Sequence, residues 1–344
     1  MASLPIDIIE LILSKSSLKP LLRFKSVSKS WNALISDPLF LKNRHRKSKP
    51  SNSQDLFICC DHKGAFTLVK LKDQKLEIVQ ELGTQSESYR CHCHGLVLLA
   101  TKYLGRCTVW NPSTRTETGV YTRLPCFYGS AGLSHDPVTD DVKVVIVFSI
   151  DFFFVYSCKN ESPMLWYAEH KDGDPPIVYG QFDEKKGVCV DGAIYWVWSR
   201  HNVKKLIYFD PRIDKIKYLP MPKDAMESKM FFLADLGGFV CLRCEGRENE
   251  NTVKIWIKEK GIDNNSWKYL TTIDDFGNVK MDIQSFEPQC FVGDKIVIRN
   301  KNDDKLVVYS LLDKTFEQYG EMERKCCASG LIPYLQDKTS LKRP

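Results

Sequence analysis

A pair of short β-rich runs recurs from Leu56 almost to the end of the chain and limits the folds that are possible. The first run of a pair is often opened by glycine. The second often ends at Asn-Pro or Asp-Pro, where proline lacks the N–H that a sheet needs. The clearest pairs occupy residues 56–60 and 66–71, 95–99 and 107–112, 192–198 and 205–211, 238–242 and 253–257, and 292–298 and 305–309. A less regular unit spans residues 134–170.

Successive second runs lie roughly 35 to 60 residues apart, near the length of a propeller blade. We therefore expect an all-β domain over residues 56–336, a divergent β-propeller of about six blades with one sheet poorly formed. A ring lets many small sheets bury both faces against neighbours. The large aromatic residues near the turns should pack between blades; they are Trp110, Trp196, Trp198, Tyr208, Phe209 and Trp256. The segment from Gly330 to Leu335 could pair with the strand near Leu56 and close the ring.

Residues 4–40 follow a different pattern, which predicts a small all-α unit of three amphipathic helices. The apolar spacing places the first helix around Ile8–Leu13, the second after Pro20 and the third around Trp31, ending before Pro38. A unit this small buries too little of its own surface to be comfortably stable, so we expect it to need a partner. The chain then divides into a helical head (1–45), a basic Ser/Pro linker (46–55), the β domain and a polar tail (337–344).

The head resembles an F-box in the form common among plant proteins. The resemblance rests on Leu4-Pro5, Ile8-Ile9, Leu13, Leu22-Arg23-Phe24-Lys25, Val27, Lys29-Ser30-Trp31, Leu34-Ile35 and Pro38. It implies docking on a Skp-type adaptor and, through the adaptor, on the cullin and RING subunits of a ubiquitin ligase. The adaptor contacts that it implies are Leu4, Pro5, Ile8, Ile9, Ile12, Leu13, Leu21, Leu22, Val27 and Trp31. Trp31 is equally suited to packing inside the head.

Two positions in the head depart from this family. Ser16-Ser17 stands where an apolar residue and proline are usual, and Ser28 stands where cysteine is frequent. The first departure could loosen the turn between the first two helices and weaken adaptor binding. An ordinary helical hairpin that closes on itself or on the next domain is the structural alternative.

The body resembles the F-box-associated domain that follows the F-box in many plant proteins. This resemblance rests on Trp110–Arg115, Ser134–Pro137 with Asp140–Val145, and Gly192–Trp196. The two resemblances together imply a substrate-recognition subunit whose β domain binds a protein target for ubiquitination. The alternative is a propeller scaffold or ligand-binding protein outside any ligase. The target-binding residues are not assigned; the candidate segments are Phe152–Phe154, Tyr167–Pro176 and Arg243–Asn251.

The charge distribution argues against a general nucleic-acid binder. Residues 1–50 carry ten Lys or Arg against three Asp or Glu, a surplus of +7, so the remaining residues supply −1 of the net +6. The basic cluster between Lys42 and Lys49 is either a nuclear-localisation patch or a solvated linker face. No run is apolar and long enough to span a membrane, and the first residues lack secretory features. We expect a cytoplasmic or nuclear protein whose thirteen cysteines are reduced.

No familiar catalytic motif occurs in the sequence, so we expect a non-catalytic protein without cofactor or metal. Cys91-His92-Cys93-His94 has the residue types that bind zinc. Alternation along a strand would, however, send its cysteines and histidines to opposite faces. Ser134, His135 and Asp136 are neighbours along a strand and should likewise point apart rather than form a triad.

Overall fold

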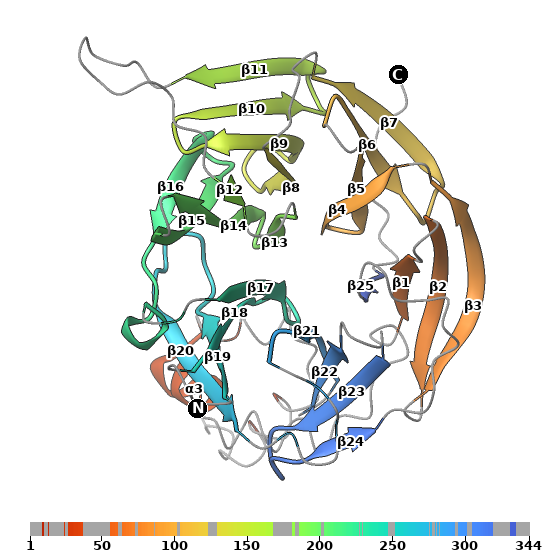
Figure 1. Cartoon of the computed structure of the whole chain (residues 1–344). Helices are drawn as coiled ribbons and strands as arrows, with labels where there is room; N and C mark the ends of the chain where they lie inside the picture. The colour runs from red at the N-terminus through yellow and green to blue at the C-terminus, as the bar shows by residue number, and fades with distance from the viewer. Residues whose placement is uncertain are drawn as a thin grey trace, which may run out of the picture.

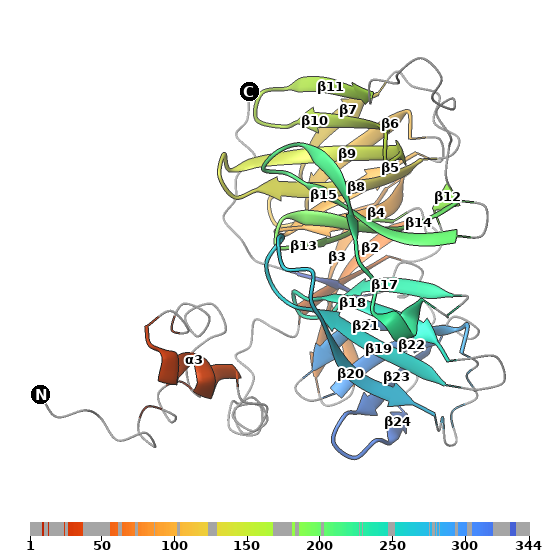
Figure 2. The same ribbon diagram turned by 90° about the vertical axis from the view of Figure 1, so that its left-hand side faces the viewer.

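Six antiparallel sheets stand around a common axis in the computed structural model, as the blades of a propeller do (Figure 1). The structure describes residues 9, 13, 24, 27–36, 56–60, 64–72, 75–85, 87–101, 104–122, 129–167, 181–182, 186–200, 203–226, 228, 230–246, 252–274, 276, 279, 281, 283–292, 295–300, 305–318 and 331–334. The blade count and the β-propeller class agree with the expectation from the sequence. In the head, the structure describes helix α3 (Lys29–Ser36) (Figure 2). The three-helix arrangement stays a prediction.

The first three blades follow one another along the chain. The first blade contains β25 (Ile332–Pro333), β1 (Leu56–Cys60), β2 (Ala65–Lys72) and β3 (Lys75–Thr84). The second contains β4 (Ser88–Cys93), β5 (Leu96–Ala100), β6 (Arg106–Asn111) and β7 (Thr116–Tyr121). The third contains β8 (Ser130–Asp136), β9 (Asp141–Ser149), β10 (Phe152–Ser157) and β11 (Ser162–Tyr167). In each blade the strands stand in this order from the axis outward (Figure 1).

The last three blades repeat this plan. The fourth contains β12 (Gln181–Phe182), β13 (Val188–Val190), β14 (Ala193–Arg200), β15 (Val203–Asp210) and β16 (Lys215–Leu219). The fifth contains β17 (Phe231–Asp235), β18 (Val240–Glu245), β19 (Val253–Lys258) and β20 (Trp267–Ile273). The sixth contains β21 (Phe286–Val292), β22 (Lys295–Asn300), β23 (Lys305–Ser310) and β24 (Phe316–Gln318). A short 3₁₀ helix, η1 (Lys223–Ala225), lies between β16 and β17.

The position of a strand within its blade explains its sequence. The second strand β5, Leu-Val-Leu-Leu-Ala, is buried at every residue because blades cover both of its faces. The outer strand β7, Thr-Glu-Thr-Gly-Val-Tyr, is mostly exposed or half-buried. Each pair of runs recognised in the sequence is a second and third strand of one blade, joined in antiparallel register. The repeat was therefore visible where burial is greatest.

The irregular blade is the fourth rather than the third. The third blade is regular, because β8 to β11 pair along their full lengths. In the fourth blade, the innermost strand is divided into β12 and β13, which pair with different parts of β14. Glycine-opened strands guided the sequence assignment, and the third blade lacks that feature while keeping its strands.

The ring closes through its C-terminal strand, as the sequence suggested. Ile332 of β25 pairs with Ile58 of β1, and the amide of Tyr334 donates a hydrogen bond to the carbonyl of Leu56 at 2.9 Å. The two apolar residues of this segment serve different interfaces. Leu331 packs in the cluster toward the sixth blade, and Ile332 packs in the cluster toward the second.

Aromatic side chains fill the spaces between blades. Of the six aromatic residues expected to pack between blades, five are buried and Trp256 is half-buried. The Phe152–Phe154 run is also buried, at most 8% exposed, because its side chains alternate between the clusters on the two faces of β10. This corrects its inclusion among candidate target-binding segments. Most of the other two candidate segments lies outside the described residues.

Candidate partner-binding surfaces

Helix α3 begins with a side-chain cap. Ser28 precedes the helix, and its hydroxyl accepts a hydrogen bond from the backbone N–H of Trp31 at 3.1 Å. A serine in this position satisfies one of the amides that the first turn of a helix leaves without a partner. Ser28, which departs from the family pattern, therefore has a clear role in this chain.

A small apolar cluster holds the head together. Leu13 is fully buried at its centre, and Ile9, Phe24, Trp31 and Leu34 are half-buried around it. The rings of Phe24 and Trp31 meet edge to face at 5.6 Å. Leu13 is the one fully buried side chain among the head residues that the structure describes, and burial of a leucine is worth about 1.5–3 kcal/mol.

The structure describes four of the ten residues to which the resemblance assigned adaptor contacts. Val27 is 59% exposed, so its side chain is accessible to a partner. Leu13 lies inside the cluster, and Ile9 and Trp31 form part of its wall. The remaining six lie outside the described residues; they are Leu4, Pro5, Ile8, Ile12, Leu21 and Leu22. Adaptor contact by any of the ten stays a prediction.

The two ends of the ring differ in their connections. We call turn end the end that carries the turns from the first to the second strand and from the third to the fourth strand of each blade. We call loop end the opposite end, which carries the turn from the second to the third strand and the connections between blades. At the turn end, an Asx side chain caps each of the three Asx-Pro turns seen in the sequence. Asn111 accepts from the amide of Ser113 at 3.0 Å, Asp136 from that of Val138 at 2.9 Å, and Asp210 from that of Arg212 at 3.2 Å. These side-chain caps hold the turns that follow β6, β8 and β15.

Charged side chains also join neighbouring blades at the turn end. The ammonium group of Lys143, on the third blade, lies 2.7 Å from Asp214 on the fourth and 3.7 Å from Asp136 on its own blade. The guanidinium of Arg212, on the fourth blade, donates two hydrogen bonds of 2.7 Å to Asp263 on the fifth. These interactions fix the turns of three successive blades relative to one another.

Asp210 is the buried centre of the second network. Burial by itself would raise the pKa of its carboxyl, but hydrogen bonds from Arg212 and Lys217 outweigh burial and lower the pKa to about 2. The Lys217 ammonium lies 2.9 Å from the carboxylate. Asp210 is therefore ionised at neutral pH and holds both cations.

Polar side chains from opposite blades interact across the axis of the ring. The hydroxyl of Tyr89 is hydrogen-bonded to Nδ1 of His92 at 2.8 Å, and Nε2 of His92 lies 3.5 Å from Asp235. Because His92 is on the second blade and Asp235 on the fifth, these side chains connect opposite sides of the ring. The ammonium group of Lys186 lies 5.5 Å above the Tyr89 ring.

The two sequence patterns that suggested chemistry separate in space. Cys91 and Cys93 enter an apolar cluster, whereas His92 faces the axis and His94 stacks on His135 at 4.4 Å. Ser134 donates to the carbonyl of Gly192, and His135 lies 2.9 Å from Asp140. The described residues contain no group of three or more His, Cys, Asp or Glu side chains that could hold a metal ion. No helix in the described ranges is long and apolar enough to cross a membrane.

The loop end has longer connections and exposed apolar residues. The longest connections between blades leave from this end; they join β11 to β12, β16 to β17, β20 to β21 and β24 to β25. Met226 and Met230, beside η1, are 61% and 37% exposed. Exposure alone does not distinguish the two ends, because Val138 at the turn end is 78% exposed.

Comparisons with known families match both parts of the chain. The family described as F-box associated beta propeller domain matches residues 56–336, and the F-box domain family matches residues 1–43. F-box protein CPR1 of Arabidopsis thaliana is 24% identical, over 91% of this chain and 83% of its own length. The F-box/kelch-repeat protein At3g23880 of the same plant is 26% identical over 79% of each chain.

Two solved structures are similar to this chain at low sequence identity. A chain in the crystal structure of a nidogen/laminin complex aligns with 80% of this chain and 95% of its own length, at 10% identity and a TM-score of 0.47. The β-propeller domain of Myceliophthora thermophila Cps50 (Swd1) aligns with 78% of this chain and 84% of its own length, at 11% identity and a TM-score of 0.46.

Proposed function

Because this chain belongs to the plant F-box proteins that carry an F-box-associated β-propeller domain, we propose that it is the substrate receptor of a Skp–cullin–F-box ubiquitin ligase. The observation that carries this proposal is the pairing of the two matched domains in one chain. In this role the head binds a Skp-type adaptor, the adaptor brings the cullin and RING subunits, and the propeller binds the target protein.

The head has the properties of an adaptor-binding unit. Its described core has one fully buried side chain, while Val27 remains largely exposed beside α3. The head sequence contains further isoleucines and leucines, which lie outside the described residues. Burial of several such side chains against an adaptor would stabilise the head and offset the entropic cost of association.

The position of the chain entry favours the loop end for target binding. Strand β1 is a second strand, so it begins at the turn end, and the linker reaches the ring there at Leu56. The turns at this end are short and joined by ion pairs between blades. Inner strands of five to seven residues separate the two ends by about 20 Å. A target at the loop end would thus stay clear of the adaptor.

This receptor needs no catalytic group of its own. Tethering a target to the ligase raises the concentration of the target's lysines near the ubiquitin-charged enzyme, which accelerates transfer by proximity. Recognition and positioning are the two tasks that we assign to the propeller.

Adaptor binding is tested by co-purification of the full chain with a Skp-type adaptor. We expect the double variant Leu4→Ala, Pro5→Ala and the single variant Val27→Asp to lose the adaptor at least tenfold. Val138→Asp, a matched surface change on the propeller, should retain it. Equal adaptor recovery with all variants, or absence of cullin and adaptor from pull-downs of the native protein, would favour the scaffold function instead.

Target binding is tested by proximity labelling in cells with and without proteasome inhibition. The variant Met226→Asp alters the loop end and Val138→Asp alters the turn end, at residues that are both more than half exposed. We expect Met226→Asp to lose labelled proteins that accumulate when the proteasome is blocked, while adaptor binding is unchanged. Loss with Val138→Asp alone would place the target at the turn end.

A further inference from the structure

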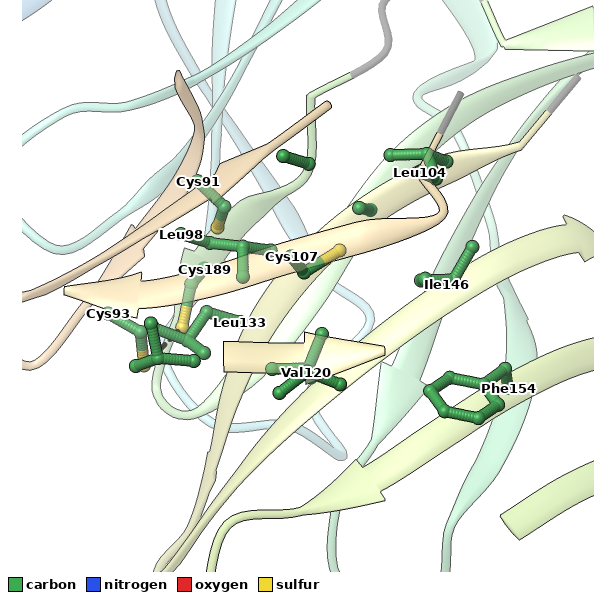
Figure 3. Packing of buried hydrophobic residues seen from close by; sticks show 14 of the residues in the cluster. Cys91, Cys93, Leu98, Leu104, Cys107, Val120, Leu133, Ile146, Phe154 and Cys189 are labelled. Atoms are coloured by element: carbon green, nitrogen blue, oxygen red, sulfur yellow. Dashed lines mark hydrogen bonds between the residues drawn. The ribbon is translucent and has the colours of Figure 1, made fainter. Parts of the chain in front are cut away.

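Three cysteines from two blades meet in one apolar cluster near the axis. Cys91 and Cys93 come from β4 of the second blade, and Cys189 comes from β13 of the fourth (Figure 3). All three are at most 8% exposed. The thiol of Cys189 donates to the sulfur of Cys93, with the two sulfurs 2.7 Å apart. This distance is only about 0.7 Å longer than a disulfide bond.

The backbone explains why β13 comes so close to β4. The inner strand of the fourth blade is divided, and its second part, β13, has only three residues. Just before it, the amide of Gly187 donates to the carbonyl of Ala131 on β8 at 3.2 Å, and Lys186 forms a bridge with Ala131. A Cβ atom at position 187 would lie 2.5 Å from a methyl group of Ile194, so only glycine fits. β13 therefore packs on β8 and reaches past it to β4.

We propose that Cys93 and Cys189 form a reversible disulfide, which joins the second blade to the fourth when the protein meets hydrogen peroxide. One thiolate attacks a peroxide oxygen, the O–O bond breaks, and hydroxide leaves as water, which produces a sulfenic acid. The second sulfur then attacks the first, the S–O bond breaks, and a second water leaves with the remaining proton. The two thiols lose two electrons and two protons, and the peroxide is reduced to two waters. A small dithiol reduces the disulfide back to two thiols by thiol–disulfide exchange.

The surroundings determine the rate of this reaction. Burial raises the pKa of the Cys189 thiol well above its ordinary value, and the nearby sulfur of Cys93 raises it further. Since the thiolate is the reacting species, the disulfide should form slowly at neutral pH and faster as the pH rises. A short strand at the axis can also open locally and admit the peroxide. The site is thus suited to sustained oxidation rather than to a rapid response.

The cross-link would close a loop of chain that contains the third blade. It joins residues 93 and 189, so the whole of β8 to β11 lies within the closed loop of chain. A disulfide over a loop of this length restricts the unfolded chain strongly, and the oxidised protein should melt higher, by on the order of 5 °C.

Peptide mapping of the purified full chain tests the proposal directly. Trypsin cleavage after Arg90, Lys102, Lys186 and Arg200 yields peptide 91–102, which contains Cys91 and Cys93, and peptide 187–200, which contains Cys189. After peroxide treatment and alkylation of free thiols, we expect the two peptides as one linked species that separates on reduction with dithiothreitol.

Substitution of each cysteine by alanine shows which sulfur of the second blade forms the disulfide. Alanine is apolar and therefore suits this buried site. The linked species should persist in Cys91→Ala and disappear in Cys93→Ala. If it requires Cys91 instead, the assignment to Cys93 is wrong. If both peptides keep free thiols while the half-buried Cys158 becomes oxidised, the proposal is overturned. The readout in unmodified protein needs no variant to fold and does not depend on ligase function.

Discussion

Closure of the ring through Leu331 and Ile332 makes a quantitative prediction. Both side chains are buried, at 5% and 2% exposure, and they belong to clusters on opposite sides of the first blade. Replacement of a buried leucine or isoleucine by alanine costs about 2–5 kcal/mol. Because the two residues are neighbours that hold the same short strand, their effects couple, and the double variant should lose more than either single variant, up to about 10 kcal/mol. This is most of the stability of an ordinary domain.

Urea unfolding followed by tryptophan fluorescence measures this loss. We expect Leu331→Ala and Ile332→Ala each to lower the midpoint clearly and the melting temperature by at least about 5 °C, and the double variant to be largely unfolded at 37 °C. Leu312→Ala is the matched control, since Leu312 is 45% exposed at a turn, and its stability should change by less than about 0.5 kcal/mol. Midpoints of the closure variants that coincide with that of the control would refute the view that these residues hold the ring closed.

Two further predictions concern the turn end. Asp210→Asn removes the charge that holds Arg212 and should lower the free energy of unfolding by about 2 kcal/mol at pH 7. Because the folded pKa of Asp210 is about 2, below its ordinary 3.8, its contribution is complete above about pH 4 and is lost as the pH falls toward 2. The difference in urea midpoint between the unmodified protein and the variant should therefore be smaller at pH 3 than at pH 5. An equal difference at the two pH values would contradict this reasoning. Gly192→Ala should destabilise the protein by more than about 2 kcal/mol, because Gly192 has φ +83° and an added Cβ would lie 2.2 Å from the carbonyl oxygen of His135. Gly105→Ala, which has open space around it, is the control, and equal melting temperatures would show that the close approach is not required.

The sequence was informative where burial and turn chemistry coincide. Second and third strands are apolar because blades cover both faces, and an Asx-Pro turn ends the third strand in two blades and the innermost strand in another. Those two signals were enough for the class, the blade count and the closing strand. The outer strands, such as β7, carry mostly exposed polar residues and resemble loops.

Contacts between distant segments were not predictable in the same way. Cys93 and Cys189 meet because β13 reaches past the third blade. Nothing in the local sequence at either residue indicates that their sulfur atoms lie close together. The Phe152–Phe154 run is among the three candidate recognition segments because such segments were expected in loops, whereas the run lies in strand β10. Consecutive apolar residues instead suit a strand that is buried on both faces. In the head, the spacing of the apolar residues did not identify Leu13 as the residue at the centre of the cluster.

The place of β25 within the first blade has a consequence for biosynthesis. The ribosome makes β1 early, but the strand that pairs with its inner edge, Ile332–Pro333, is translated after the strands of the other five blades. Until those residues leave the exit tunnel, a nascent chain keeps an unpaired strand edge and two uncovered apolar surfaces, which chaperones bind and proteases cut. A product that terminates before Ile332 would keep them permanently, so we expect proteases to cut it faster than a chain that contains β25.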